Sequence, residues 1–469
     1  MNLLARLPPG LLADVGPALM VSAVFMAIFG LAELLRGFNL CSKEMSRKFV
    51  HLAAGVVATT FAYVFTSHWT LLVMCAAFVV LVKAGKAFDL LPSIHGVSRQ
   101  SWGAVLHPVA IYLTFVTCAA MRRPEYYVIA TLVLSVSDAL AALIGKAYGF
   151  KIYEVETEEG RKSVEGSVIF LLSTFIIVHL GLLLLTDTGR LECVLSAIVI
   201  AILVTIFEAL SLGGADNFFI PFGTLFVLMK LAHAPVAMLA FRVGLILFTM
   251  GSTLLFAVVS GKFGTSGVIG IGLVGYGCWI LVAWHWYIPI LITTLLLAFT
   301  DLFIETRDDE EPDQVRVRPV FYMFIVSFAW LLVGSFFQHL VRPLTVPFLI
   351  TITAALSVRW AWQIRSQRPD PADTRPRWLV RPGFVGRAFL LTVIYLAFHL
   401  AIRDFGLEPV FSFLSLWIGT MLGDRLYWAI GGRHLGQWAR VDFLRMGMVV
   451  ILFTSALVFW ANLAYYQAR

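Results

Sequence analysis

Charged residues are scarce in this chain. Asp, Glu, Lys and Arg make up only 13% of its 469 residues, whereas hydrophobic residues make up 60%. A soluble protein of this size needs far more polar surface, so the composition excludes a soluble fold. The net charge of +7 is modest, and the basic residues lie in loops beside apolar runs. No basic face is left for nucleic acid, and we expect no nucleic-acid partner.

Cysteine and the common nucleotide-binding loop are also lacking. The five cysteines are scattered, mostly inside apolar runs, without the spacing of metal ligands. The chain contains no Gly-x4-Gly-Lys-Ser/Thr motif, so an ordinary ATP-binding fold is not indicated. The first apolar run is followed by further runs and not by a small-residue cleavage site, so we expect no cleavable signal peptide.

What the chain does have is a long series of apolar runs. A helix needs roughly 20 apolar residues to cross the hydrocarbon of a bilayer. We therefore expect an all-α polytopic membrane protein with about 14–16 transmembrane helices. The predicted spans are 16–36, 48–66, 69–85, 103–121, 126–148, 165–186, 191–211, 218–233, 235–259, 266–284, 287–304, 319–341, 343–362, 388–402, 409–430 and 441–465. The shorter runs 69–85 and 218–233 could instead be re-entrant.

Lys and Arg recur in alternate loops, around residues 43–48, 83–99 and 146–162. Cytoplasmic loops of membrane proteins carry an excess of these residues, so this side is expected to be cytoplasmic. Arg122 and Arg123 fall on the opposite side, against the trend. We expect a multi-pass protein of the bacterial inner membrane.

Two polar, charged stretches, 305–318 and 363–387, interrupt the apolar pattern and are typical of solvated cytoplasmic loops. With the first as a boundary, we predict three parts. Residues 1–260 form a membrane-embedded domain that carries the polar clusters described below. Residues 261–304 form connecting transmembrane helices, and residues 305–469 form a C-terminal transmembrane bundle of unassigned role.

Four polar clusters lie at span ends, all on the side expected to be cytoplasmic. Ionisable groups inside or beside spans are costly, so such clusters point to function. In the first cluster, Arg47 and His51 are four residues apart and therefore share a helix face that points into the bundle. Arg47 and Lys48 would by themselves also fit a snorkelling anchor at the membrane boundary, but His51 lies one turn deeper.

The second cluster centres on Asp138, in a helix that is otherwise small and apolar. Small residues around it, including Gly145, allow a neighbouring helix or a ligand to approach closely. An unpaired carboxylate inside the membrane is expensive, so Asp138 should meet a cation, either a metal ion or Arg47. A purely structural salt bridge is the alternative.

The third cluster opens the span at 165–186. Lys162 and Ser163, followed by Glu165 and Gly166, place a cation, a hydroxyl and backbone N–H groups at a helix N-terminus. Such a combination favours phosphate binding. Ser163 could also simply cap the helix.

The fourth cluster joins two spans. Glu208 is followed by the glycines at 213–214 and then by Asp216 and Asn217. The glycines make a flexible turn, and the acid and amide oxygens suit Mg²⁺ or a substrate hydroxyl.

These four blocks, in this order, resemble the family of CTP-dependent membrane lipid kinases, which includes dolichol kinase, phytol and farnesol kinase, and the CTP-using diacylglycerol kinase. The phosphatidate cytidylyltransferases are similar more distantly. The resemblance extends over about residues 40–232. The residues that carry it are Arg47, Lys48, His51, Asp138, Gly145, Gly149, Lys162, Ser163, Glu165, Gly166, Ser167, Asp216, Asn217 and Pro221.

The resemblance implies phosphoryl transfer from CTP, with Mg²⁺, to the hydroxyl of an isoprenoid or other lipid alcohol. It makes residues 1–260 the catalytic domain. Arg47, Lys48 and Lys162 would then hold triphosphate oxygens. Asp138 and Asp216 would bind the metal or poise the hydroxyl, with His51 as a third catalytic residue. The expected support for nucleotide and metal comes from Gly145, Ser163, Glu165, Gly166 and Asn217.

Two other functions stay open at this point. A CTP-dependent cytidylyltransferase acting on a lipid phosphate would use the same groups but attack the α-phosphorus. A secondary transporter would also have many spans and intramembrane acids. A transporter should show paired halves, however, and the one hint of a repeat is an echo of Asp138–Gly145 in Asp424–Gly431, which we interpret as a chance match.

Overall fold

The computed structural model describes residues 10–87, 103–154, 161–211, 214–261, 263–298, 317–366, 388, 391–393, 408–431 and 440–467. Nearly all the regular structure in these ranges is helical, and several helices are long and apolar enough to cross a membrane. The expected all-α polytopic membrane fold is therefore confirmed. Most of the two polar stretches 305–318 and 363–387 lies outside the described residues, as does most of the expected span 388–402.

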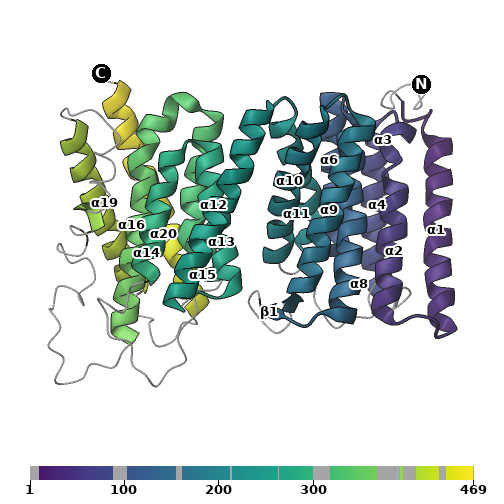
Figure 1. Ribbon diagram of the computed structural model, residues 1–469, viewed down its shortest axis with the longest axis horizontal. Helices are drawn as coiled ribbons and strands as arrows, with labels where there is room; N and C mark the ends of the chain where they lie inside the picture. Colours follow the sequence, from purple (N-terminus) through teal and green to yellow (C-terminus); the bar gives the residue numbers. More distant parts are fainter. Residues whose placement is uncertain are drawn as a thin grey trace, which may run out of the picture. The chain divides into compact units, whose positions relative to one another are not determined.

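The chain divides into two compact units, Met1–Leu245 and Ile246–Arg469, and the division falls within helix α12. The helices of unit 1 are roughly parallel in Figure 1, and one short hairpin lies at their lower end in this view. Its elements are α1 (Val15–Gly37), α2 (Lys43–Ala58), α3 (Phe61–Val64), α4 (His68–Ala87), α6 (Gly103–Met121), α7 (Pro124–Leu132), the π-helix η2 (Val133–Ser137), α8 (Asp138–Tyr148), β1 (Ile152–Glu154), β2 (Arg161–Ser163), α9 (Val164–Leu185), α10 (Arg190–Leu210), α11 (Asp216–Leu231) and the start of α12 (Val236–Ser260).

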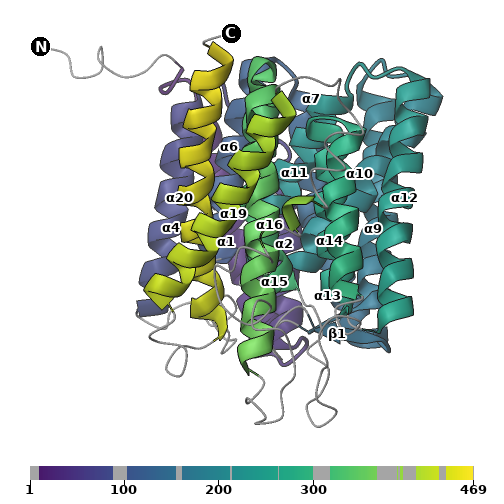
Figure 2. The ribbon, with the colours of Figure 1, turned by 90° about the vertical axis from the view of Figure 1, so that its left-hand side faces the viewer.

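Unit 2 is a second bundle, and Figure 2 shows its helices α15, α16, α19 and α20 lying side by side. Its core joins apolar side chains from α13 to α20. Its elements are the rest of α12, then α13 (Thr265–Leu281), η4 (Trp284–Tyr287), α14 (Ile288–Ala298), α15 (Val317–Phe336), η6 (Gln338–Leu340), α16 (Val341–Ser366), α19 (Glu408–Gly431) and α20 (Arg440–Gln467).

Five stretches within the described ranges are long and apolar enough to span a membrane by themselves. They are Val15–Gly37, Pro124–Tyr148, Val164–Leu185, Arg190–Leu210 and Val236–Ser260. Shorter apolar helices occupy most of the other expected spans. The two runs suspected of being re-entrant are continuous helices, α4 and α11. With 16 residues, α11 is only about 24 Å long, which is less than the roughly 30 Å of hydrocarbon in a typical bilayer.

Helix α9 illustrates why lipid is the solvent of this fold. One of its faces is buried, with Phe170, Thr174 and Val178 at helical spacing. The opposite face is just as apolar but exposed, with Leu172 and Ile176 about half accessible. A helix in water would carry polar residues on that outer face, whereas a helix in hydrocarbon needs none.

Candidate functional site

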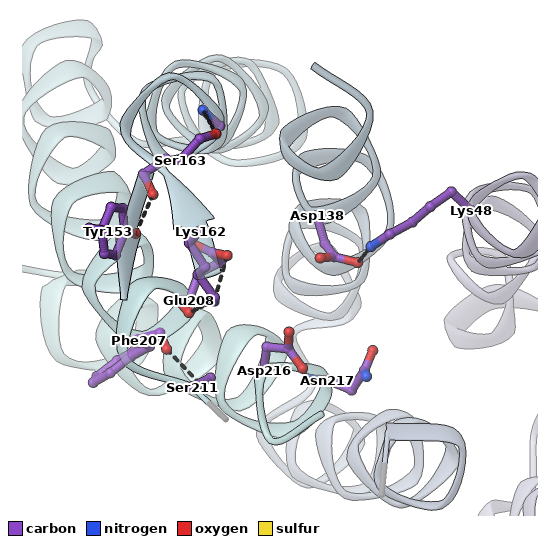
Figure 3. Close-up of polar contacts among 12 residues, drawn as sticks. Lys48, Asp138, Tyr153, Lys162, Ser163, Phe207, Glu208, Ser211, Asp216 and Asn217 are labelled. Atoms are coloured by element: carbon purple, nitrogen blue, oxygen red, sulfur yellow. Dashed lines mark hydrogen bonds and ion pairs between the residues drawn. The ribbon is translucent and has the colours of Figure 1, made fainter. Parts of the chain in front are cut away.

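The four polar clusters come together at one end of unit 1. The start of α2, helix α8, the hairpin β1–β2, and the junction of α10 with α11 all lie toward this end (Figure 1). Figure 3 shows Lys48, Asp138, Lys162, Glu208 and Asp216 around one region, each contributed by a different element. We call this region the polar site. The convergence expected from the sequence is thus present in the structure.

Asp138 pairs with Lys48 across the interface of α8 and α2. The Lys48 Nζ lies 2.7 Å from the Asp138 Oδ2, and both side chains are largely buried, 7% and 14% exposed. The Nε2 of His51 lies 3.3 Å from the same oxygen and 3.3 Å from the carbonyl oxygen of Leu134. A buried carboxylate is tolerated when cations and hydrogen bonds compensate it, and Asp138 has both.

The cation that meets Asp138 is therefore Lys48, whereas the sequence had suggested Arg47 or a metal ion. Lys48, His51 and Gly55 are three and four residues apart, so they share the face of α2 that packs against η2 and α8. Arg47 is exposed. Only a residue without a side chain fits at 55, because a Cβ atom there would come within 1.8 Å of the Ser135 Oγ.

Asp138 follows directly on the π-helix η2. Single π-helical turns inside α-helices often occur at functional sites. This one is held on two sides: the Ser135 hydroxyl donates to the Thr131 carbonyl at 2.7 Å, and Thr174 of α9 donates to the Ser137 hydroxyl at 3.0 Å. The segment that positions Asp138 is therefore fixed by buried hydrogen bonds.

Lys162 reaches the polar site from the hairpin. Its strand β2 pairs antiparallel with β1, placing Lys162 opposite Tyr153. The Lys162 Nζ lies 2.7 Å from the Glu208 Oε1 and also donates to the main-chain carbonyl of Glu208. Burial works against the charged ammonium, but the carboxylates of Glu208 and Asp216 outweigh it and raise the pKa of Lys162 above its ordinary value. Lys162 therefore stays protonated throughout the physiological range.

The residues around Lys162 hold the hairpin onto the helices. The Ser163 hydroxyl accepts a hydrogen bond from the Gly166 N–H at 3.1 Å and so caps α9, as the alternative reading of this cluster had proposed. The Glu165 carboxylate accepts from the N–H of Lys151 at 3.2 Å. Gly145 packs so closely on the start of α9 that a Cβ atom would lie 2.8 Å from the Ser163 Oγ. These contacts are structural, and a role in nucleotide binding stays a prediction.

Asp216 and Asn217 open α11 at the far side of the polar site. The turn before them needs glycine, because Gly214 adopts a φ of +88°. The Asn217 side chain donates to the Gly214 carbonyl at 3.4 Å, and the Asn217 N–H donates to the Asp216 Oδ1 at 3.0 Å. Gly213 lies outside the described residues.

Sequence reasoning missed His107 of α6. Its ring makes an edge contact with the His51 ring at 5.1 Å between centroids, and the Asn217 side chain lies close enough to interact with it. Within the described part of the chain, its Nδ1 is buried without a partner. The available signal was an ionisable residue inside an apolar run, directly before the helix-interior Pro108. His107 joins the first and fourth clusters.

A comparison with known proteins agrees with this geometry. The chain is similar to a phytol kinase. It is 29% identical over 193 residues to the phytol kinase of Synechocystis sp., and the aligned part covers 41% of this chain and 82% of that protein. The similarity supports a relationship to lipid-alcohol kinases. No family model matches the chain, and no solved structure does.

No ready-made metal cage is present in the part of the chain that the structure describes, where His, Cys, Asp and Glu form no group of three or more able to hold an ion. The oxygen donors at the polar site are nevertheless of the kind Mg²⁺ takes. This ion usually binds one or two carboxylates, keeps several waters and takes its remaining ligands from substrate phosphates. Asp138 and Asp216 fit that mode.

Proposed function

We propose that this protein is an integral-membrane kinase that transfers a phosphoryl group from CTP to the hydroxyl of a lipid alcohol of the polyprenol or isoprenoid type. The observation that carries the proposal is the meeting of two buried cation–carboxylate pairs, Lys48–Asp138 and Lys162–Glu208, with Asp216 at one end of a membrane bundle. The similarity to a phytol kinase supports the same class of reaction.

The parts at the polar site are those that phosphoryl transfer needs. In this reaction a protein mainly positions the reactants and neutralises charge. Lys48 and Lys162, with the exposed Arg47 nearby, supply cations for triphosphate oxygens. Asp138 and Asp216 supply carboxylates for a metal or for the acceptor hydroxyl. His51, whose Nε2 lies 3.3 Å from Asp138, can hold a proton close to that carboxylate.

The charge balance supports a metal–nucleotide complex as the donor. The two buried lysines already face three carboxylates, those of Asp138, Glu208 and Asp216. A bare triphosphate would therefore add uncompensated negative charge in a partly desolvated region. Mg²⁺ bound with the nucleotide would neutralise the charge on the phosphates and stabilise the charge that moves during transfer. Asp138, Asp216 and the Asn217 amide would hold it.

The remaining predicted residues support the same assignment. Ser163 and Gly166 form the capped N-terminus of α9, and Gly145 brings α8 against it. Glu165 fixes the chain that leads into β1. We propose that this frame supports the bound nucleotide by keeping Lys162 in position.

The place of the polar site at a bundle end suits a lipid acceptor. The hydroxyl of a lipid alcohol lies at the membrane interface, while its chain stays in the hydrocarbon beside apolar helix faces such as that of α9. We propose that the nucleotide arrives from the cytoplasm, because the Lys- and Arg-rich loops lie at this end.

The test is transfer by the purified full-length protein in lipid vesicles with Mg²⁺ and terminally labelled CTP or ATP. The acceptors are phytol, farnesol, a polyprenol, diacylglycerol and the corresponding lipid phosphates. We expect labelled lipid phosphate and CDP. CDP-lipid plus pyrophosphate would identify a cytidylyltransferase instead, and the absence of any product would contradict both enzymes. Glu192→Gln is the matched control, since this acid lies on α10 but at the end opposite Glu208.

A further inference from the structure

Glu208 is a buried acid of the polar site and forms an ion pair with Lys162. It occupies the last turn of α10 and is only 9% exposed. Its Oε1 and its main-chain carbonyl both accept from the Lys162 ammonium. An ammonium has three N–H donors, so Glu208 takes two of them and holds Lys162 in place.

The second carboxylate oxygen of Glu208 makes no hydrogen bond to Lys162. Among the described residues, the Oε2 is buried and has no hydrogen-bond partner. Leaving a buried charged acceptor unsatisfied costs more than a typical hydrogen bond contributes. A counter-ion for Lys162 alone does not require this, because one carboxylate oxygen and the carbonyl already make the contact. The unsatisfied oxygen therefore points to a donor that arrives with a ligand.

The surroundings of Glu208 restrict what that donor is. Glu208 is close enough to Asp138 and Asp216 for their charges to act on it, and Figure 3 shows it between Lys162 and Asp216. A phosphate oxygen is excluded because it is itself a negatively charged acceptor. A hydrocarbon chain is excluded because it donates nothing. Hydroxyl groups are the donors that a nucleotide and a lipid alcohol both carry.

We propose that Glu208 is a substrate-binding residue whose Oε2 accepts a hydrogen bond from a substrate hydroxyl, while its Oε1 and carbonyl hold Lys162 for the phosphates. This assignment rests on the proposed kinase function. The shared chemistry is an O–H donor, and it has two possible sources, the ribose of the nucleotide and the acceptor alcohol. One residue would then fix a cation and a hydroxyl at a set distance from each other.

Glu208→Gln tests the assignment because it replaces one carboxylate oxygen with an NH2 group. Because the Lys162 ammonium can only donate, the amide keeps its oxygen toward Lys162 and places its NH2 group at the Oε2 position, so the acceptor there is lost. We expect kcat/KM to fall roughly tenfold to a hundredfold, as for the loss of a hydrogen bond to a charged group. Glu192→Gln should leave kcat/KM unchanged.

Substrate analogues separate the two hydroxyl sources from a simple counter-ion role. The first ratio compares kcat/KM for CTP with that for 2′-deoxy-CTP and 3′-deoxy-CTP. The second compares inhibition constants of a lipid alcohol and of its methyl ether, which lacks the O–H donor. In the wild type, one of these two ratios should show a preference for the compound that carries the hydroxyl. In Glu208→Gln the same ratio should approach unity, because the preference is lost.

Unchanged ratios in Glu208→Gln would overturn the assignment, even if activity falls, because Glu208 would then act through Lys162 alone. Lys162→Gln provides the reference for that pattern, with lower activity and intact ratios. If Glu208→Gln fails to fold, Glu208→Asp keeps the charge but withdraws the carboxylate by one methylene, and the same ratios decide. If the wild-type protein transfers nothing, both the kinase function and this assignment are overturned. If the wild type is active but the ratios are unchanged in Glu208→Gln, this assignment alone is overturned.

Discussion

Unit 1 buries carboxylates at both ends of its bundle, and the two ends hold them differently. At the end opposite the polar site, Asp14 precedes α1 and is 1% exposed. It accepts hydrogen bonds from the N–H and hydroxyl of Thr66, the N–H of Ser67 and the hydroxyl of Thr70, all between 2.8 and 3.1 Å. These neutral donors lie around the first turn of α4, where a negative charge is also favourable.

The polar site uses long cationic side chains where the Asp14 end uses short neutral donors. Asp138 and Glu208 each meet a lysine, and two buried atoms there, the Nδ1 of His107 and the Oε2 of Glu208, have no partner in the described part of the chain. A structural acid is satisfied by groups that are already fixed in the fold. An acid that binds a substrate is expected to keep a carboxylate oxygen without a hydrogen-bond donor, and to pair with a lysine that can also contact a phosphate.

Asp138→Asn should have the largest effect, lowering kcat by about a thousandfold, as removal of a key electrostatic group does. It should also destabilise the protein by about 3–5 kcal/mol, because Lys48 is left as an uncompensated buried charge. The double variant Asp138→Asn with Lys48→Met should recover much of the stability but none of the activity. Transfer assays and thermal unfolding in the same detergent measure both. Recovery of activity along with stability would show that Asp138 is structural, like Asp14.

Lys162→Gln should lower kcat/KM roughly tenfold to a hundredfold by removing a charged contact to phosphate, mainly through a higher KM for the nucleotide. Initial rates at varied CTP and varied alcohol separate the two constants. An unchanged KM for CTP would remove Lys162 from the phosphate site.

His107→Phe should lower kcat about tenfold or less, since it keeps the ring contact with His51 but loses the polar interaction with Asn217. His107→Gln can restore part of that interaction and should recover part of the rate. If both variants lose the same activity, the interaction with Asn217 is not what His107 contributes. Steady-state rates of the two variants decide.

Asp14→Asn should leave the rate per folded protein unchanged but lower the free energy of unfolding by about 1–3 kcal/mol, because the amide places donors against donors. Although burial opposes the charge, the hydrogen bonds from Thr66, Ser67 and Thr70 outweigh it and lower the pKa of Asp14 below its ordinary 3.8. A lowered pKa means that the stabilisation is complete above the ordinary pKa and is lost as pH falls through the lowered one. The stability gap between wild type and variant should therefore close below about pH 4. A gap that stays constant down to pH 2 would contradict this.

The sequence predicts most of the fold because the bilayer demands long apolar helices with their backbone bonds satisfied internally. It also predicts which blocks come together at the polar site, because ionisable residues are rare enough in spans to be noticed. It did not predict that Lys48, one residue after Arg47, faces Asp138. The rotation of α2 is set by the packing of Gly55 on Ser135, a contact between segments far apart in the chain.

Two further features could not be read from the local pattern. The π-helix before Asp138 has no sequence signature here, because it depends on how α2 and α9 pack around it. Strand β2 is three residues long and is defined by its pairing with β1, and so its alternation is too short to recognise. The echo around Asp424 falls in helix α19, as the original falls in α8, but the side chain of Asp424 lies outside the described residues.

The pairing of Tyr153 with Lys162 carries a consequence for how such sequences can vary. Successive residues of a strand point to opposite faces, so a slip of one position would present Arg161 or Ser163 where the ammonium now sits. A single inserted or deleted residue within either strand would thus separate the Lys162 ammonium from Glu208 without changing any acidic residue. Homologues should therefore keep the three-residue pairing invariant.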